Sequence, residues 1–531
     1  MAIKSSIIND SMQHLIFAQR NQYRLSTSYY STNSIEQEDM NYGHNVSKTS
    51  FSFRHWSLRG LFVAGLIGSL SACHKTTDDV TPQTTTSDNQ TVNDWILSNM
   101  QELYYWNDKI PANPDKTLAP DAFFDSILNK YDATTNPTGD RFSWIEESGA
   151  QLQAELSGQT LTTGMEYDLY LRSSGSTSVI AQVLYVLPGS PAANAGIKRG
   201  DVISKVNGQS ITTTNYSDLL YSGATNYTFG FAGVSNSSLV DTDKTISVTA
   251  TTFQENPVFL DSVYTVGSKK VGYLVYNQFI PGANGSNTGE YDAQVDAVFN
   301  KFQTQGVNEL VLDLRYNPGG YTSSSANLAS LIGKNINSSK LYFREEWNAT
   351  ATKEILADPQ YGGNSFFITN FLDKAQNIGA NLSRVFVLTT DHTASASELI
   401  INGLRPYMTV TTIGTTTYGK NVGSITVTDD TGKIKWGMQP IVFKSFNSAG
   451  SSDYSTGFTP NVTVEEPLNL LPLGDTKEAM LSAALSQISG TTSSNGRQAA
   501  TASNPLKSFG SSIQRKVGGY TMIRSLKTLK F

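Results

Sequence analysis

Ser395 lies between a short apolar run and a helix-like run, a favourable position for a nucleophilic serine. Residues 384–388 are rich in β-branched and aromatic side chains and predict a buried strand, and residues 398–404 predict a helix. A hydroxyl at this junction lies near the unpaired amides and the positive dipole end of the helix. Those groups stabilise the negative charge that develops beside an attacking serine. Ser395 is therefore the candidate nucleophile, and Ser397 is the alternative.

The histidine inventory removes the usual base for such a serine. His392 is only three residues from Ser395, whereas the members of a Ser-His-Asp triad usually come from separate elements. We expect His392 to be a loop residue. The other histidines all precede residue 75, in a predicted leader and linker: His14, His44, His55 and His74. A serine enzyme built on this chain needs a different base.

Lys420 is the alternative base. A lysine takes a proton only when its amine is neutral, and burial in apolar surroundings lowers the lysine pKa toward the working range. The neighbours of Lys420 suit burial, because they are apolar residues and glycines that permit close packing: Ile413, Gly414, Tyr418, Gly419, Val422 and Gly423. Ser-Lys dyads are a known variant of the triad logic. Spacing alone does not establish that Lys420 and Ser395 meet.

A family resemblance supports the pairing. Residues 393–398 (Thr-Ala-Ser-Ala-Ser-Glu), followed by residues 418–420 (Tyr-Gly-Lys), resemble the active-site signature of the C-terminal processing (tail-specific) peptidases, family S41. Residues 313–320 (Asp-Leu-Arg-Tyr-Asn-Pro-Gly-Gly) and 457–460 (Gly-Phe-Thr-Pro) are similar to two further motifs of that family. The resemblance covers roughly residues 93–485 and implies an α/β fold with a ClpP/crotonase-like catalytic core.

The resemblance implies a role for each residue of the site. Ser395 would be the nucleophile and Lys420 the general base, with Glu398 orienting the lysine. In other members a glutamine four residues after the lysine orients it, and here that position is Ser424. The family lysine often lies in Gly-Lys-Gly, whereas Asn421 follows Lys420 here.

The same resemblance places an oxyanion hole. Its donors would be the backbone N–H of Ala396 and those of the turn formed by Gly319 and Gly320, where glycine lets a carbonyl oxygen approach the main chain closely. We expect Arg315 to be structural and paired with a carboxylate rather than substrate-binding, and Asp313 to be structural as well.

Residues 155–252 form short alternating strands that resemble a PDZ domain of bacterial proteases. The similarity rests on the Pro-Ala-Ala helix start near residue 191, the Gly-Asp turn at 200–201 and the Asn-Gly turn at 207–208. PDZ domains add a peptide strand at a sheet edge and bind its terminal carboxylate on backbone amides. The matching loop would include Thr163, Gly164 and Met165. An unrelated small β-domain is the alternative.

The N-terminal region predicts export and lipidation. Basic residues Arg54 and Arg59 flank the start of an apolar run, 61–70, and small residues precede Cys73. This order is typical of a secretory signal peptide and resembles a bacterial lipobox, which implies cleavage before Cys73 and a lipid anchor on its thiol. Because a signal peptide normally opens a protein, Met40 is a candidate start.

These signals divide the chain into consecutive regions. The predicted order is a leader with a lipoprotein signal peptide (1–73), a linker (74–92), an N-terminal helical domain (93–150) whose first helix is capped near Asn93, the PDZ domain (155–252), the peptidase core (255–488) and a basic low-complexity tail (490–531). The tail contains seven Lys or Arg residues and no acidic residue, and we expect a disordered appendage.

Composition bounds the function. A formal net charge of −6 gives no electrostatic footprint for nucleic acid, and a single cysteine excludes intrachain disulfides and Cys-based zinc sites. The sequence thus predicts an extracytoplasmic, membrane-anchored serine endopeptidase that acts on proteins or peptides with free C-termini. The predicted enzyme needs neither metal nor cofactor, and the sequence is compatible with an oligomer. A non-catalytic peptide- or ligand-binding envelope protein and a PDZ scaffold are the alternatives.

Overall fold

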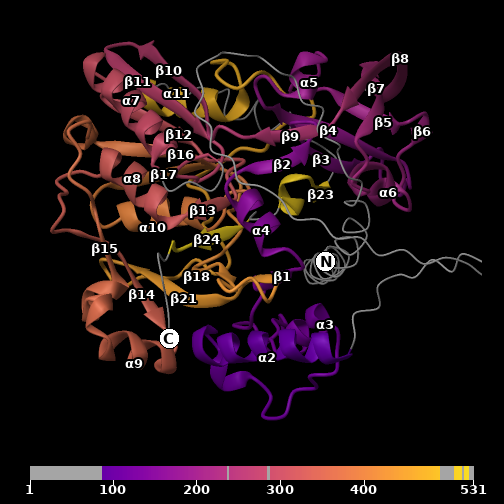
Figure 1. The fold of residues 1–531 in the computed structure, drawn as a ribbon. Coiled ribbons are helices and arrows are strands. Elements are labelled where there is room, and N and C mark those ends of the chain that lie inside the picture. The colour runs from indigo at the N-terminus through magenta and orange to yellow at the C-terminus, as the bar shows by residue number, and fades with distance from the viewer. Residues whose placement is uncertain (1–85, 236–237, 284–287, 491–507, 517–519, 526–531) are drawn as a thin grey trace, which may run out of the picture.

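The computed structural model describes residues 86–235, 238–283, 288–490, 508–516 and 520–525 (Figure 1). The predicted signal peptide, Met40 and Cys73 lie outside the described residues. Within the described residues, no helix combines the length and the apolar character needed to cross a membrane.

The predicted peptidase core is built on a mostly parallel six-stranded sheet. Its strands, in spatial order, are β10 (Val258–Val266), β11 (Lys269–Tyr276), β12 (Glu309–Asp313), β16 (Arg384–Thr389), β17 (Thr409–Gly414) and β22 (Val462–Thr463). All pairs are parallel except β10 with β11. Helices alternate with the parallel strands along the chain, which agrees with the expected α/β fold.

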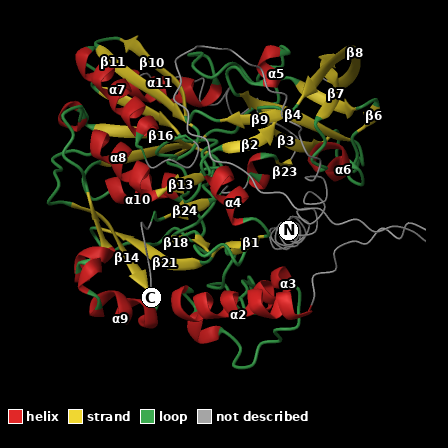
Figure 2. Ribbon diagram, viewed as in Figure 1, coloured by secondary structure: helices red, strands yellow, loops and turns green. Residues whose placement is uncertain are grey.

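Helices cover both faces of this sheet (Figures 1 and 2). They are α7 (Glu290–Thr304), α8 (Thr322–Ile332), α10 (Ala396–Leu404) and α11 (Ala479–Ser489). Leu310 and Leu312 of β12 pack in one cluster with α7, α8 and α10, whereas Val311 packs with α11 in another. Successive side chains of a strand point to opposite faces, so a continuous apolar run such as β12 is what a doubly covered strand requires.

A second sheet lies against the first through α8 and α10. Its strands, in spatial order, are β13 (Gly319–Tyr321), β24 (Thr521–Ile523), β18 (Val422–Ser424), β21 (Ile441–Asn447), β14 (Leu341–Trp347) and β15 (Ile368–Asn370). α9 (Ala349–Ala357) follows β14. The strand β24 comes from the C-terminal end of the chain and fills the position between β13 and β18.

The PDZ region forms its own sheet with a separate core. Its elements are β3 (Met165–Leu171), β4 (Val179–Val186), α5 (Pro191–Asn194), β5 (Val202–Val206), β6 (Gln209–Ser210), α6 (Tyr216–Tyr221), β7 (Asn226–Ser235) and β8 (Ser238–Thr249). A two-stranded ribbon of β2 (Gln159–Thr162) and β9 (Thr251–Gln254) joins it to the core. Another C-terminal strand, β23 (Ser508–Ser511), extends the sheet beside β3.

The N-terminal region consists of helices that pack beside the second sheet (Figure 1). Its elements are α2 (Thr86–Leu103), α3 (Pro120–Ser126), β1 (Trp144–Glu146) and α4 (Gly149–Leu156), and β1 pairs with β20 (Gly437–Gln439), which pairs with β19 (Val427–Thr428). The prediction that Asn93 caps the first helix is wrong, because α2 already begins within the predicted linker. Asn93 is buried, and its amide donates to the carbonyls of Lys116 (3.0 Å) and Leu118 (2.8 Å).

The prediction of a disordered C-terminal appendage is wrong for residues 508–516 and 520–525. This part of the tail forms β23, a short 3-10 turn at Ile513–Arg515 and β24. Figure 1 shows the two yellow strands in different parts of the molecule, β23 at the PDZ sheet and β24 in the core.

Candidate active site

Ser395 stands at a sharp turn between β16 and α10. Its backbone has φ 58° and ψ −113°, a conformation that L-residues other than glycine rarely adopt. Such strain persists only where the surroundings enforce it, and a strained strand-to-helix turn is the geometry that exposes a nucleophilic serine to substrate. The alternative, Ser397, lies inside α10, and its hydroxyl donates to the carbonyl of Asn317 (3.0 Å). The geometry therefore favours Ser395 over Ser397.

Glu398 binds the main chain on both sides of the site. Its fully buried carboxylate accepts the backbone N–H of Ser395 (2.9 Å), of Gly419 (2.8 Å) and of Lys420 (2.8 Å), and the hydroxyl of Thr417 (2.6 Å). Burial raises the pKa of Glu398, and these donors oppose that rise. The carboxylate thus fixes the backbone of the predicted nucleophile relative to that of the predicted base. Glu398 was expected to orient Lys420. In these contacts it binds the backbone amide of Lys420 and not the side-chain amine.

Lys420 is fully buried beside the C-terminal segment, which comprises residues 508–516 and 520–525. Its amine donates to the carbonyl of Tyr520 (2.6 Å) and lies 4.5 Å from the centre of the Phe142 ring. The hydroxyl of Ser395 is also buried and makes no hydrogen bond with any described residue. The structure brings the two predicted dyad residues to one site but does not join them by a hydrogen bond.

The predicted oxyanion residues surround Ser395, with one correction. Ala396 is the first residue of α10, where backbone amides lack acceptors within the helix. Gly319 was expected to supply a donor, but its N–H is directed at Oδ1 of Asn317 (2.9 Å). Gly319 instead leaves room for Ser395. Its φ is 107°, and a Cβ on this residue would lie 2.7 Å from the Ser395 Cβ. At Gly320 a Cβ would lie 2.2 Å from the carbonyl oxygen of Phe279.

The C-terminal strand β24 lies beside Ser395. It pairs in parallel with β13, so that Gly319 faces Thr521 and Gly320 faces Met522. The Thr521 carbonyl oxygen lies 2.4 Å from the position of a Cβ on Gly319, the same position that approaches Ser395. A peptide carbonyl of the chain itself therefore lies next to the predicted nucleophile.

His392 is more than a loop residue. Its Nε2 is 3.0 Å from Oδ1 of Asp168 in the PDZ strand β3, and its Nδ1 is 3.1 Å from the hydroxyl of Tyr520. Burial alone would lower the His392 pKa, but the carboxylates of Asp168 and Asp391, with a smaller contribution from Glu466, raise it to about 9. One imidazolium thus links the active-site loop, the PDZ domain and the C-terminal segment.

We expect this link to make stability depend on pH. The His392 pKa is raised on folding, so its contribution is complete below the unfolded value of about 6.5 and is lost as pH rises through about 9. The free energy of unfolding should fall by up to about 3 kcal/mol between these values. His392→Gln should flatten that fall, as measured by urea denaturation at a series of pH values. An unchanged slope in the variant would contradict the assignment.

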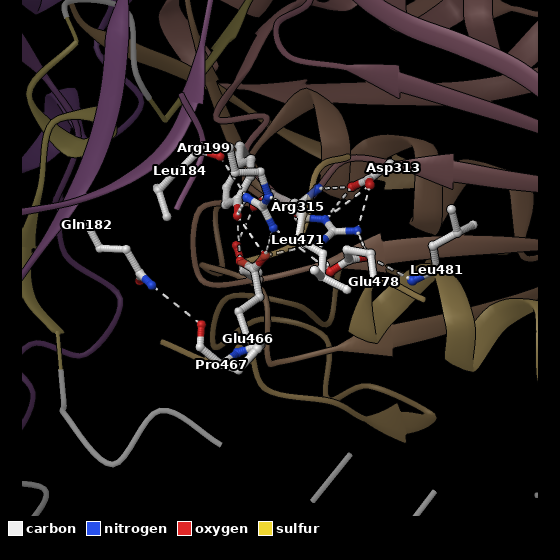
Figure 3. Close-up of polar contacts among 12 residues, drawn as sticks. Gln182, Leu184, Arg199, Asp313, Arg315, Glu466, Pro467, Leu471, Glu478 and Leu481 are labelled. Atoms are coloured by element: carbon white, nitrogen blue, oxygen red, sulfur yellow. Dashed lines mark hydrogen bonds and ion pairs between the residues drawn. The ribbon is translucent and has the colours of Figure 1, made fainter. Parts of the chain in front are cut away.

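A buried charge cluster joins the PDZ domain to the core (Figure 3). Arg315 binds Asp313 (2.8 Å), Glu478 (2.7 Å) and Glu466 (3.0 Å), and Arg199 of the PDZ domain binds Glu466 (2.6 Å). Burial alone would raise the pKa of Glu466, but the two guanidinium groups hold it at about 2. The expectation that Arg315 is structural and pairs with a carboxylate is confirmed.

The predicted carboxylate-binding loop precedes β3. Gly164 has φ 83°, and a Cβ there would lie 2.1 Å from that of Ser190. The carbonyls of Thr163 and Gly164 accept the N–H of Ala192 (2.8 Å) and Leu187 (2.7 Å), while Met165 begins β3. These contacts hold the loop against α5. The loop lies at the beginning of β3, the strand with which β23 pairs.

Comparison with known proteins agrees with this architecture. Residues 270–464 match Peptidase family S41, residues 91–144 match the Peptidase S41 N-terminal domain, and residues 182–226 match the PDZ domain family. A crystal structure described as an S41 protease from Bacteroides fragilis NCTC 9343 superposes with a TM-score of 0.62 at 30% identity, covering 75% of this chain and 97% of that one. This chain belongs to peptidase family S41. The expected α/β fold with a PDZ domain and an N-terminal helical region is confirmed.

Curated S41 relatives are more distant. A "Carboxyl-terminal-processing protease" of a Picosynechococcus species is 28% identical over 46% of this chain and 51% of its own length. A CtpA-like serine protease of Staphylococcus aureus is 26% identical over 55% of this chain and 52% of its own length. The matches thus span about half the length of these relatives.

The site includes residues that sequence reasoning missed. Tyr520 and Thr521 reach the dyad from the tail, and Asp168 reaches His392 from the PDZ domain. The tail's low apolar content gave no signal for the first two. For Asp168, the short strands expected over residues 155–252 did not indicate which residue would face the core.

Proposed function

We propose that this S41 peptidase is an extracytoplasmic serine endopeptidase of the C-terminal processing type. The observation that carries this proposal is the strained turn at Ser395, held by Glu398 through the same carboxylate that binds the backbone of the buried Lys420. A carboxylate that fixes both backbones keeps nucleophile and base in register. Names of the curated relatives point in the same direction.

The proposed reaction proceeds through an acyl-enzyme. The hydroxyl oxygen of Ser395 attacks the peptide carbonyl carbon while the neutral amine of Lys420 takes the hydroxyl proton. The oxyanion forms beside the Ala396 amide and the Gly320 backbone. Lys420 then returns the proton to the leaving amine, the C–N bond breaks, and water hydrolyses the ester by the same proton path. Before these steps can take place, the hydrogen bond from the Lys420 amine to the Tyr520 carbonyl must break.

The PDZ domain is proposed to recognise substrate C-termini. The test compares two otherwise identical peptides of about twenty residues with apolar ends, one with a free C-terminal carboxylate and one amidated. We expect a KM at least about tenfold lower for the free acid with a similar kcat, because the loop at Thr163–Met165 would bind the carboxylate on its amides. Equal KM values would contradict PDZ recognition. If neither peptide is cleaved, with the C-terminal segment present or removed, the peptidase function itself fails.

The lipid anchor at Cys73 is part of the proposal and places the enzyme at the cell envelope. It is supported by the basic, apolar and small-residue order of residues 54–73. Membrane fractionation of wild type and Cys73→Ala tests it. The wild-type protein should sediment with membranes and the variant should not; co-sedimentation of both would contradict the anchor.

A further inference from the structure

The C-terminal segment, defined here as residues 508–516 and 520–525, binds along the PDZ edge in the way expected of a peptide ligand. β23 pairs antiparallel with β3, with Ser508 opposite Tyr170 and Ser511 opposite Asp168. The Phe509 ring packs edge-on against Tyr216 of α6, with 5.6 Å between centroids. A strand added to a sheet edge, with a side chain against the neighbouring helix, is the β-augmentation mode of peptide binding.

The next part of the segment brings a cation to buried carboxylates. The amine of Lys516 lies 2.7 Å from Glu255 and 3.0 Å from Glu166, and it donates to the hydroxyl of Tyr185 (3.2 Å). Both glutamates are about 95% buried. Two buried carboxylates without a cation would be strongly unfavourable, so this pair is built to receive a basic side chain.

The last part of the segment enters the active site in the same manner. β24 lies between β13 and β18, and the Tyr520 carbonyl accepts the Lys420 amine. Arg524, one residue beyond the strand, pairs with the buried carboxylate of Glu345 and donates to the carbonyl of Phe366 (2.7 Å). An extended chain thus lies beside the proposed nucleophile and base, and a second cation meets a third buried acid.

We propose that the PDZ edge at β3 and the position between β13 and β18 together form an acceptor for an extended basic polypeptide, and that the chain's own C-terminal segment fills it as a competitive, substrate-like inhibitor. Its backbone supplies both added strands, and Lys516 and Arg524 neutralise the acceptor's carboxylates. While it is bound, the Lys420 amine is held by a carbonyl of the segment, and Ser395 faces Thr521.

The acceptor also defines a class of substrate. A polypeptide that displaces the segment must provide backbone for pairing with β3 and with β13 and β18. It must also leave Glu166, Glu255 and Glu345 neutralised, which a peptide with suitably spaced Lys or Arg residues does. We therefore expect basic, apolar-patterned extended segments to compete best. This inference deepens the proposed peptidase function and uses it for its kinetic readout.

The kinetic test releases the segment after folding. A recognition site for a specific protease, inserted within residues 491–507, lets the whole chain fold before it is cut. Peptidase activity should rise at least about tenfold after cutting and dilution to nanomolar enzyme. The uncut chain treated identically is the control. Activity that is present before cutting and does not change would overturn the inhibitory role.

A second variant keeps the test independent of cutting. Lys516→Gln with Arg524→Gln in the full-length chain should also raise activity several-fold, because the segment loses its three ion pairs with buried acids. Lys130→Gln, which removes only the exposed ion pair with Asp125, is the control and should have no effect. Equal activity of the double variant and wild type would contradict the role of the two cations.

A binding measurement separates this inference from the peptidase proposal. A fluorescent peptide of sequence 508–525 is titrated into the cut Ser395→Ala protein after removal of the released segment, and anisotropy is recorded. The wild-type peptide should bind at least about tenfold more tightly than one with Gln at 516 and 524 or a scrambled one. Selective binding of the wild-type peptide, with no hydrolysis by the wild-type enzyme, would contradict the proposed peptidase function and leave the acceptor supported. Equal binding of all three peptides would overturn the acceptor.

Discussion

Replacing Ser395 by alanine should lower kcat/KM for peptide hydrolysis by about 10⁴-fold or more, because the only proposed nucleophile is removed. The change is small in volume, and the Ser395 hydroxyl makes no hydrogen bond with a described residue, so the fold should be retained. Lys420→Met should cost a similar factor, because a nucleophile and its base act as a unit. The double variant should then be no worse than either single variant. Initial rates on one peptide, with the segment present and removed, check these expectations.

Ser397→Ala is the matched control for this experiment. Ser397 is the same residue type two positions away and equally buried, but its hydroxyl is engaged by the Asn317 carbonyl. We expect its activity to stay within about tenfold of wild type, since only one hydrogen bond is lost. If Ser397→Ala were inactive while Ser395→Ala retained activity, the nucleophile would be misassigned. Unchanged activity in all variants would remove the dyad.

The parts of the fold that were predicted from sequence are those with local signals. Residues 310–312 of β12 are apolar on both faces, as a strand covered by helices on both sides must be, and the run before Ser395 has the same character. The placement of Ser395 at a strand-to-helix junction followed from these runs. Its positive φ could not be read from residue types, because serine at such an angle is imposed by the surrounding packing rather than by its own preference.

The parts that could not be predicted depend on distant partners. The tail is Ser/Thr/Gly-rich and basic, and nothing within it stabilises a strand. Its order comes from β3, β13 and β18 and from buried carboxylates such as Glu345, which are far away in sequence. His392 is a similar case, because its partner Asp168 lies in another domain. The composition of a segment indicates how much apolar surface the segment can bury by itself. The order of the tail and the contact between His392 and Asp168 both depend instead on residues elsewhere in the chain.

The largest expected loss of stability follows from removing Arg315. Its guanidinium is fully buried and neutralises three carboxylates, those of Asp313, Glu466 and Glu478. Burial alone would lower the pKa of Arg315, but these carboxylates raise it well above its usual value. Arg315→Met should lower the free energy of unfolding by about 3–5 kcal/mol, because buried charges are left without compensation. Urea denaturation followed by tryptophan fluorescence measures the change. Lys130→Met, which breaks the exposed pair with Asp125, is the control and should cost no more than about 1 kcal/mol.

Further substitutions in the same cluster show whether the stability lost in Arg315→Met has an electrostatic cause or a packing cause. Combining Arg315→Met with Asp313→Asn and Glu478→Gln removes two of the carboxylates that the single variant leaves unpaired, and should recover a large part of the lost stability. Glu478 also accepts the N–H of Leu481 (3.0 Å) at the start of α11, so recovery should be incomplete. No recovery at all would mean that Arg315 acts through the space it fills. Recovery would show that the PDZ domain and the core are joined by compensated charge, with Glu466 shared between Arg315 and Arg199.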